Sequence, residues 1–534
     1  MISSFSIGNF KAFSETQHIP LKPITLIYGA NSSGKSSIIH ALMLAQHAQI
    51  SGDFDVYHTS KGGESIDFGG FHQYINSHNL SNSLEFVFDF ELDKSKISKR
   101  SIEISIAVPF DDYGHRVPFS NPEIVRLNVT SHGNEVIRIS KRGSNIFGID
   151  QLDPSIEKIK FKHEITIDGK KHYFETKGSD VIAIAQNYEL IRRGLLMRPK
   201  ENIDLSMRNF FAHNKVNVAK NQKEQLSFDT SRLALHSYFV NTMQPIEANL
   251  VSFLKSIWYL GPLRTYPPRH IFGSKYNDSN WYAGGGYAWE IVRKDERVRT
   301  KINKWLSDTD RLQTPYELTI RELIDINQIE EPIYRGLEEL DFLNMLNNEL
   351  DDPNSHSVYK DDTDSITRRL IGNCKDSIEE KINELVLIDR RSDTAVSHRD
   401  IGVGISQVLP VLAYSYANTQ STIAIEQPEI HLHPALQADL GDVFIESALG
   451  SNNRFLIETH SEYILLRIMK RLRQTANKEL PLGLLPIKPE DVCILFVQPI
   501  GASSTVMEIP LNEQGELIKA WPGGFFEEGI RETF

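Results

Sequence analysis

A glycine- and serine-rich segment near the N-terminus has the residue types and the spacing of a phosphate-binding loop. It lies between two apolar runs, 24–28 and 37–44, so a buried strand leads into it and a helix follows. Its residues are Gly29, Asn31, Ser32, Ser33, Gly34, Lys35, Ser36 and Ser37. The glycines let backbone N–H groups point at phosphate oxygens, Lys35 reaches the β- and γ-phosphates, and the Ser36 hydroxyl ligates Mg²⁺. We interpret the segment as a nucleotide-binding P-loop, because a plain surface turn does not require this order of strand, loop and helix.

Later segments supply the other groups that a P-loop requires. The run 422–425 ends at Glu426, an acidic residue placed to hold the Mg²⁺ shell. A second run, 454–458, leads to His460, placed where it could sense a γ-phosphate. Upstream, a short glycine- and serine-containing turn opens a helix and forms a second anion site. The residues of this turn are Gly404, Ser406 and Gln407. Together these segments predict ATP and Mg²⁺ as cofactors.

Composition limits the class of protein. The chain of 534 residues is long enough for about three domains, or for one large domain with an insertion. Its net charge of −12 argues against sequence-independent coating of nucleic acid, but a local basic groove stays possible. The two cysteines, Cys374 and Cys493, are too few for a disulfide framework or a cysteine-rich zinc site. The sequence shows neither a signal peptide nor a membrane span, so we expect a cytoplasmic protein without a membrane partner.

The distribution of apolar runs predicts an α/β fold. Strand-like runs between residues 84 and 176 are separated by turns and predict an antiparallel meander. After residue 385, apolar runs alternate with helical stretches and predict a covered, largely parallel sheet. These later runs are 385–388, 422–425, 455–457 and 492–497. We expect an N-terminal lobe over 1–180, a mainly helical insertion over 181–384 and a C-terminal lobe over 385–534.

The order of these motifs resembles that of the ABC-class ATPases. The matching order is P-loop, long insertion, Gly-Ser turn, acidic strand end and strand followed by histidine. The resemblance implies a P-loop sheet with an antiparallel β-subdomain and a mainly helical inserted arm. In that class, two nucleotides lie between the P-loop of one subunit and the Gly-Ser signature of the other. The resemblance therefore implies a homodimer or a larger homo-oligomer that forms around ATP.

Six segments narrow the resemblance to the soluble, OLD-like ATPases. They are similar to the ATPase subunit of Septu-type and retron-associated antiphage systems, and they cover the two ends of the chain better than its middle. The segments are 9–13, 29–37, 259–264, 402–410, 426–434 and 521–526. Members of this group act beside a separate HNH nuclease, and the retron systems add a reverse transcriptase with its nucleic acid. The resemblance thus implies an ATPase that regulates or scaffolds a nuclease in bacterial antiphage defence.

Three other functions remain alternatives. An OLD-like nuclease would need a fused Toprim domain, but the chain after His460 lacks an acidic strand end followed by an Asp-x-Asp pair. A DNA-repair ATPase of the SMC or RecF type would need a coiled-coil rod or a basic face, and neither is evident. A transporter ATPase shares only the core motifs.

One residue departs from the pattern of the family. The family at large has two consecutive acids, of which the second is the general base, whereas Glu426 is followed here by Gln427. An amide orients a water but cannot take its proton, and general-base assistance contributes about 10²–10⁴-fold. We therefore predict slow hydrolysis and a long-lived ATP-bound dimer. Glu429 or His460 as substitute base, and Gln427 as a neutral turn residue, are the alternatives.

Four further residues have two readings each. Gln73 either contacts Mg²⁺ and links the two lobes, as a glutamine of ABC proteins does, or is a solvated loop residue. Lys11 either reaches the nucleotide, as in similar ATPases, or lies on an edge strand. His431 and His433 have a spacing compatible with metal ligands, but no third or fourth ligand is evident, so we expect a loop at the dimer seam rather than a zinc site.

Overall fold

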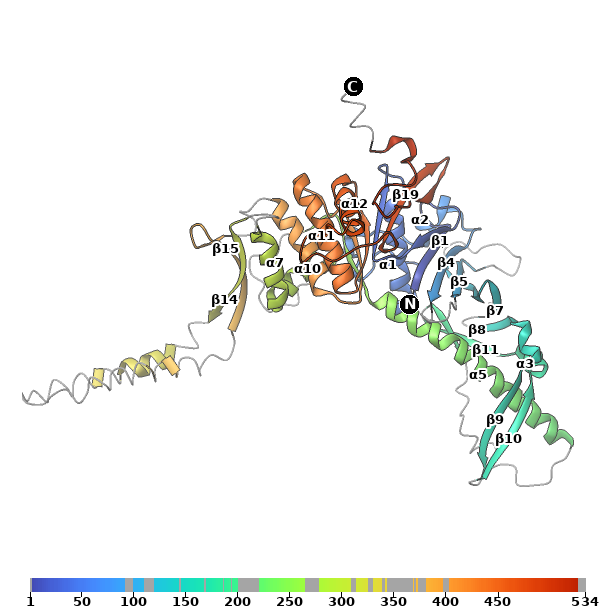
Figure 1. The fold of residues 1–534 in the computed structure, drawn as a ribbon. Coiled ribbons are helices and arrows are strands. Elements are labelled where there is room, and N and C mark those ends of the chain that lie inside the picture. Colours follow the sequence, from blue (N-terminus) through green and yellow to red (C-terminus); the bar gives the residue numbers. More distant parts are fainter. Residues whose placement is uncertain are drawn as a thin grey trace, which may run out of the picture. The chain divides into compact units, whose positions relative to one another are not determined.

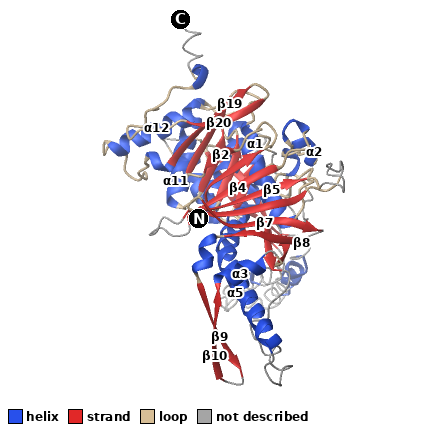
Figure 2. Ribbon diagram, turned by 90° about the vertical axis from the view of Figure 1, so that its right-hand side faces the viewer, coloured by secondary structure: helices blue, strands red, loops and turns tan. Residues whose placement is uncertain are grey.

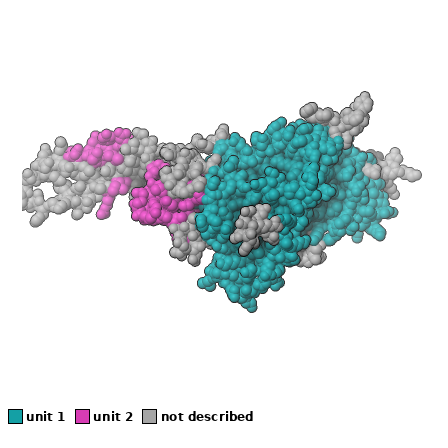
Figure 3. All heavy atoms as spheres, turned by 90° about the horizontal axis from the view of Figure 1, so that it is seen from above, with its two compact units in different colours: residues 1–265, 277–288, 407–534 teal, residues 266–276, 289–406 magenta. Residues whose placement is uncertain are grey.

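The computed structural model divides into two compact units, which Figure 3 colours separately. The described residues are 2–91, 99–109, 120–143, 146–167, 170–185, 187–193, 195–199, 220–264, 278–308, 314–324, 330–338, 341–342, 368, 371–372, 381–396 and 403–526. Unit 1 comprises Met1–Thr265, Asn277–Ala288 and Gln407–Phe534, and unit 2 comprises Tyr266–Tyr276 and Trp289–Ser406. The two ends of the sequence therefore share one unit, and residues 181–265 of the expected insertion belong to it as well.

A mainly parallel sheet in unit 1 contains the P-loop strand, with a neighbour on each side. In the described part of the chain, its strand order is β13 (Ile257–Leu260), β17 (Thr422–Glu426), β18 (Arg454–Glu458), β3 (Ile24–Gly29), β19 (Val492–Ile500) and β20 (Ser503–Glu508). Neighbouring strands are parallel except β19 and β20. β3 and β17 are buried at every residue, as expected for strands covered on both faces. Because the strands are parallel, the carboxyl ends of β17, β18 and β3 lie at one edge of the sheet.

Helices cover both faces of this sheet. α1 (Lys35–Ser51) packs on β3, β18 and β13, and α11 (Pro434–Gly450) packs on β18 and β3. Successive residues of β18 point to opposite faces, so Phe455 contacts Phe444 of α11 while Leu456 joins the core cluster that contains α1. α12 (Glu462–Ala476) packs on α11, and α10 (Val403–Ala417) precedes β17 (Figure 1).

A nine-stranded antiparallel sheet forms the rest of the core of unit 1 (Figure 2). Its order is β12 (Leu196–Pro199), β11 (Glu189–Arg193), β8 (Ile146–Leu152), β7 (Asn134–Gly143), β6 (Glu123–Ser131), β5 (Lys99–Ala107), β4 (Leu84–Glu91), β1 (Ile2–Gly8) and β2 (Gln17–Pro20). Buried and less buried residues alternate along β4, which is typical of a strand with one face toward a core. One apolar cluster includes side chains of this sheet, of α1 and of the parallel sheet, so α1 links the two sheets.

A long helix and a hairpin lie beside the antiparallel sheet. The hairpin consists of β9 (Lys160–Ile167) and β10 (Lys170–Lys177), and α3 (Gly178–Ala185) follows it. α5 (Lys220–Lys255) runs along α3 and the hairpin and also contacts α1 (Figure 2). The remaining short elements of unit 1 are α2 (Phe71–Tyr74) and the 3₁₀ turns Gly63–Ser65, Asn76–His78, Pro154–Lys158, Pro489–Asp491 and Pro522–Gly524.

Unit 2 contains a small sheet with a helix packed on it. β14 (Tyr316–Ile324), β15 (Lys381–Asp389) and β16 (Thr394–Val396) form an antiparallel sheet in the described residues. α7 (Glu296–Ser307) contacts β14, and α6 (Gly286–Lys294) leads into α7. The Asn303 side chain of α7 bonds both the N–H and the C=O of Leu318, which fixes the helix to the strand.

The C-terminal segment packs beside the P-loop strand. The rings of Trp521 and Phe526 lie 5.4 and 5.5 Å from the ring of Tyr28, which immediately precedes the P-loop. Tyr28 is fully buried, and its hydroxyl donates to the Ser461 carbonyl at 3.0 Å. The last described residues of the chain thus contact the strand that leads into the P-loop.

The observed architecture confirms the predicted α/β fold class, with two regions assigned to the wrong sheet. Residues 160–176 were expected in the meander, but β9 pairs with β10 in a separate two-stranded sheet. The run 385–388 was expected in the parallel sheet, but it lies in β15 and pairs antiparallel with β14. That expectation was wrong because an apolar run indicates a strand without indicating which strand it pairs with. The strand β8 was missing from the predicted meander, because its glycine and polar residues weaken the alternation of apolar and polar residues. Among the described residues, no helix combines the length and the apolarity needed to cross a membrane.

Candidate nucleotide site

The backbone of the loop after β3 requires glycine at two positions. Gly29 has a φ of 150°, and a Cβ there would lie 2.4 Å from the carbonyl oxygen of Val497. Gly34 has a φ of 94°, and its Cβ would lie 2.5 Å from the Cβ of Ala12. The loop therefore curls tightly between two neighbouring segments and delivers the chain into α1.

The side chains of the loop differ in their exposure to solvent. Asn31 and Ser32 are exposed at its tip, whereas Ser33 and Ser37 are buried. The Ser33 hydroxyl oxygen has no hydrogen-bond partner. Ser36, in the first turn of α1, is half-buried and donates to Glu458. The loop thus offers open N–H groups at the tip and oriented hydroxyl groups at its base.

Lys35 is held inside its own loop. Its side chain is only 4% exposed, and its ammonium donates to the carbonyl of Ala30 at 2.9 Å. Burial lowers the pKa of Lys35, and the nearby carboxylates of Glu458, Glu429 and Glu426 oppose this shift. A buried ammonium with one neutral acceptor is favourably placed to exchange that acceptor for phosphate oxygens.

Two carboxylates lie side by side at the edge of the parallel sheet. Glu426 ends β17 and Glu458 ends β18, and the two residues are direct neighbours in the strand register. Glu426 accepts a hydrogen bond from the Tyr259 hydroxyl at 3.0 Å. Glu458 accepts one from Ser36, and burial together with the charge of Glu426 raises the pKa of Glu458 to about 7. The Oε2 atom of Glu458 is buried and has no hydrogen-bond partner.

One hydrogen bond and one close contact connect Lys11 to Glu426. The Lys11 ammonium donates to Nδ1 of His40 at 2.7 Å, and Nε2 of His40 lies 3.3 Å from Oε1 of Glu426. Because Lys11 can only donate, the proton of a neutral His40 is on Nε2, the nitrogen nearer to Glu426, where it makes no hydrogen bond. Burial lowers the pKa of Lys11 to about 8, and it also lowers the pKa of His40.

The turn after Glu426 is held from two sides. Gln427 has a φ of 46°, and its N–H donates to the Glu458 carbonyl at 2.7 Å. The buried Arg264 guanidinium donates to the carbonyls of Glu426 and Gln427, at 2.9 and 3.0 Å. It also donates to the Gln407 carbonyl, and the Gln407 amide donates back to the Arg264 carbonyl. Gln407 and Arg264 therefore hold each other in place.

Glu429 anchors the loop that contains His460. Its carboxylate accepts from the Thr459 hydroxyl and from the His460 N–H, each at 2.8 Å. Burial raises the pKa of Glu429, which these hydrogen bonds partly oppose. His460 itself is half-buried, and burial followed by the charge of Lys35 lowers its pKa. An uncharged imidazole next to Lys35 can accept a proton or a hydrogen bond.

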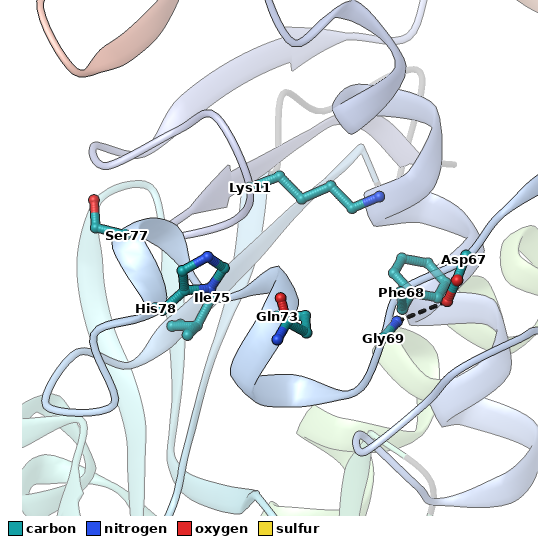
Figure 4. A pocket seen from close by; sticks show the side chains of 8 residues that line it. All are labelled: Lys11, Asp67, Phe68, Gly69, Gln73, Ile75, Ser77 and His78. Atoms are coloured by element: carbon teal, nitrogen blue, oxygen red, sulfur yellow. Dashed lines mark hydrogen bonds between the residues drawn. The ribbon is translucent and has the colours of Figure 1, made fainter.

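Lys11 and Gln73 line one pocket of about 630 Å³ (Figure 4). Gln73 is on α2 and exposed, and Lys11 approaches from the loop after β1 with a φ of 46°. The other lining residues are Asp67, Phe68, Gly69, Ile75, Ser77 and His78. The pocket therefore begins at the Lys11–His40–Glu426 chain, but no described contact connects Gln73 to Ser36 or Glu426.

Four further residues singled out by the sequence lie near the N-termini of α10 and α11. Gly404 and Ser406 are in the first turn of α10 and belong to unit 2, whereas the P-loop belongs to unit 1. His433 is the N-cap of α11, where its Nδ1 accepts from the Ala435 N–H at 3.3 Å. His431 has a φ of 64° in the preceding turn.

Sequence reasoning missed three residues of this site. Glu458 ends a buried strand with an acid, which is the same signal that identified Glu426. Arg264 ends the segment 259–264, whose pattern gives no sign that the guanidinium would contact the turn after Glu426. His40 gave no signal, since one histidine inside an apolar helix is more often part of the core.

Comparison with known proteins identifies the class of this site. A family model described as an AAA ATPase domain matches residues 1–465, and a model described as a protein of unknown function (DUF3696) matches residues 487–533. A search of curated proteins finds no match.

Solved structures align along nearly the whole chain, at low similarity. The SMC head domain from Thermotoga maritima aligns with a TM-score of 0.34 and 10% identity over 96% of this chain and 99% of that one. An SmcHead bound to the C-winged helix domain of ScpA aligns with a TM-score of 0.35 and 10% identity, over 96% of this chain and 98% of that one. A third structure is the Smc head domain with an extended coiled coil, bound to the C-terminal domain of ScpA from Pyrococcus furiosus. It aligns with a TM-score of 0.34 and 10% identity, over 100% of this chain and 98% of that one. These scores are too low to support an inference.

Proposed function

Because the chain belongs to the AAA ATPase domain family, we propose that it binds ATP with Mg²⁺ between two copies and hydrolyses the ATP slowly. In its ATP-bound form it regulates or scaffolds a separate HNH nuclease in the bacterial cytoplasm, as part of antiphage defence. The observation that supports the nucleotide chemistry is the convergence of Lys35, Glu426 and His460 at one sheet edge, with an amide at position 427.

The residues at the P-loop fit a nucleotide and its metal ion. Loop N–H groups and the N-terminus of α1 favour the phosphates, and Lys35 exchanges the Ala30 carbonyl for phosphate oxygens. The partnerless oxygens of Ser33 and Glu458 are buried polar atoms that a bound group would satisfy. Ser36 and Glu426 would hold Mg²⁺, with Gln73 as a further candidate, and the ion would supply charge neutralisation for the phosphates.

Slow hydrolysis follows from the groups around Gln427. Its amide cannot take a proton from water. Glu429 is a poor substitute base, since both of its oxygens already accept hydrogen bonds from the His460 loop. His460 has a lowered pKa and is neutral near pH 7, so it is the remaining candidate for residual turnover. A protein with these groups would keep ATP bound long enough to act as a clamp.

The dimer and the partners rest on the resemblance of the sequence motifs. In the proposed dimer, Gly404 and Ser406 of one copy complete the nucleotide site of the other. The similarity of segments 259–264 and 521–526 to antiphage ATPases supports an HNH nuclease as partner. In a retron-associated system, a reverse transcriptase and its nucleic acid would join the assembly.

The proposal is tested by measuring molecular mass and phosphate release with and without Mg·ATP. We expect the wild type to form a dimer or larger assembly with ATP and to release little phosphate. Lys35→Ala should abolish both. Lys488→Ala, at an exposed lysine paired with Glu490, is the control and should behave like the wild type.

Two further results would contradict the proposal. One is rapid turnover without an ATP-dependent increase in mass. The other is metal-dependent DNA cleavage by the purified chain, which would favour a nuclease. Coexpression with an HNH protein encoded by a neighbouring gene tests the partner, since an ATP-dependent complex is expected.

A further inference from the structure

Glu458 is a buried carboxylate at the candidate nucleotide site. It ends β18, the strand between the P-loop strand β3 and the Glu426 strand β17. Its side chain is only 5% exposed. The Ser36 hydroxyl donates to its carboxylate, and Lys35 is close enough to stabilise its charge. Glu458 is thus nearer in strand order to the P-loop than Glu426 is.

Glu458 lies close to two other carboxylates, and one of its oxygens has no hydrogen-bond donor. The adjacent Glu426 carboxylate repels it, and Glu429 adds to the repulsion. Its Oε2 atom is buried without any hydrogen-bond donor, although buried carboxylate oxygens are normally satisfied. Glu426, by contrast, accepts from Tyr259 and faces His40. A divalent cation between the two strand ends would relieve the repulsion and satisfy the open oxygen.

We propose that Glu458 is a second carboxylate of the magnesium site, acting with Glu426 and the Ser36 hydroxyl on the ion of bound Mg·ATP. Mg²⁺ prefers hard oxygen ligands and is usually held by one or two carboxylates together with substrate phosphates. By accepting the hydrogen bond of the Ser36 hydroxyl, Glu458 would also leave the lone pairs of that hydroxyl free for the ion. The inference rests on the proposed function, because it requires Mg·ATP at the P-loop.

The second acid of this site is on a different strand from Glu426. Glu458 ends β18 and is in register with Glu426. The turn after β17 has Gln427, which cannot take a proton from water, so Glu458 would add a carboxylate at the ion without supplying the missing general base.

The test is the Mg²⁺ dependence of nucleotide binding, measured with a fluorescent ATP analogue at equilibrium. In Glu458→Gln we expect the Mg²⁺ concentration for half-maximal binding to rise about tenfold or more. In EDTA, the same variant should bind the metal-free analogue as tightly as the wild type or more tightly, since a negative charge facing the phosphates is removed. Bound Mn²⁺ in place of Mg²⁺ should give an altered electron paramagnetic resonance spectrum.

Glu85→Gln is the matched control. Glu85 accepts from the Ser105 hydroxyl at 2.7 Å and also has a pKa raised to about 7 by burial, but it lies in the antiparallel sheet. It should leave the Mg²⁺ dependence and the Mn²⁺ spectrum unchanged. If Glu458→Gln does not fold, Glu458→Asp retains the charge on a shorter side chain and should give a smaller shift in the same direction.

The outcomes separate the inference from the proposed function. An unchanged Mg²⁺ midpoint in Glu458→Gln, or an equal loss of binding with Mg²⁺ and with EDTA, would overturn the role of Glu458. Failure of the wild type to bind the analogue under either condition would overturn the proposed function itself.

Discussion

Lys11 and His40 are joined by a hydrogen bond of 2.7 Å, which links the loop after β1 to the P-loop helix. The far side of the His40 ring faces Glu426, so one contact couples the Lys11 pocket to the acid at the end of β17. We therefore expect a change at Lys11 to alter the surroundings of Glu426 at this edge of the sheet.

Lys11→Met tests this coupling. The methionine keeps most of the side-chain volume but removes the charge that faces the pocket and the bond to His40. Since a hydrogen bond from a charged group contributes about 1.5–3 kcal/mol, we expect ATP affinity to fall roughly 10- to 100-fold. Isothermal titration calorimetry measures the loss, with Lys488→Met as the exposed control. Equal affinities for the variant and the wild type would show that Lys11 only supports the fold.

Gln427→Glu should restore a general base. The expected result is a rise in phosphate release of about 10²-fold or more, with a shorter lifetime of the ATP-bound dimer. Gln420→Glu is a suitable control because Gln420 also has a positive φ, 51°, and is exposed before β17. No rise in turnover would mean that position 427 does not orient the attacking water. This result would contradict the proposal that Gln427 makes ATP hydrolysis slow.

Arg264→Lys should loosen the turn at Gln427. A lysine cannot reproduce the three hydrogen bonds that the planar guanidinium donates to the carbonyls of Gln407, Glu426 and Gln427. We expect unfolding to become easier by about 2–4 kcal/mol, together with a loss of ATP turnover. Chemical denaturation and phosphate release measure the two effects.

Arg299→Lys is the control for Arg264→Lys. Arg299 also donates to two backbone carbonyls, those of Val292 and Arg293, but it belongs to unit 2. It should lower stability without the same loss of ATP turnover. If Arg299→Lys reduces phosphate release to the same extent, the effect of Arg264→Lys reflects a general loss of stability.

Glu85 predicts a specific dependence of stability on pH. Its pKa is raised by burial from 4.5 to about 7, so between these values the folded state binds more protons than the unfolded state. The free energy of unfolding should therefore fall as pH rises from 4.5 to 7. In Glu85→Gln this fall should be smaller, which urea unfolding at pH 4.5, 6 and 7.5 would measure. Parallel pH profiles for the variant and the wild type would contradict the prediction.

The sequence predicts many residues of the site but few of the contacts between them. The P-loop and Glu426 were predictable because local spacing determines a strand, a tight glycine turn and a helix. The Lys11–His40 contact and the pairing of Glu426 with Glu458 were not, because both depend on which strands become neighbours. The same limit explains why the run 385–388 was recognised as a strand but assigned to the wrong sheet.

The strand order of the parallel sheet also has a consequence during protein synthesis. β3 is made within the first thirty residues, yet both of its neighbours, β18 and β19, begin after residue 453. The aromatic residues that cover Tyr28 come later still, at 521–526. On the ribosome, β3 is therefore the first strand of the parallel sheet to be made. Its two neighbours in that sheet are made only when almost the whole chain has been synthesised. Messages truncated before this region would yield chains with an intact P-loop sequence and no ATP site.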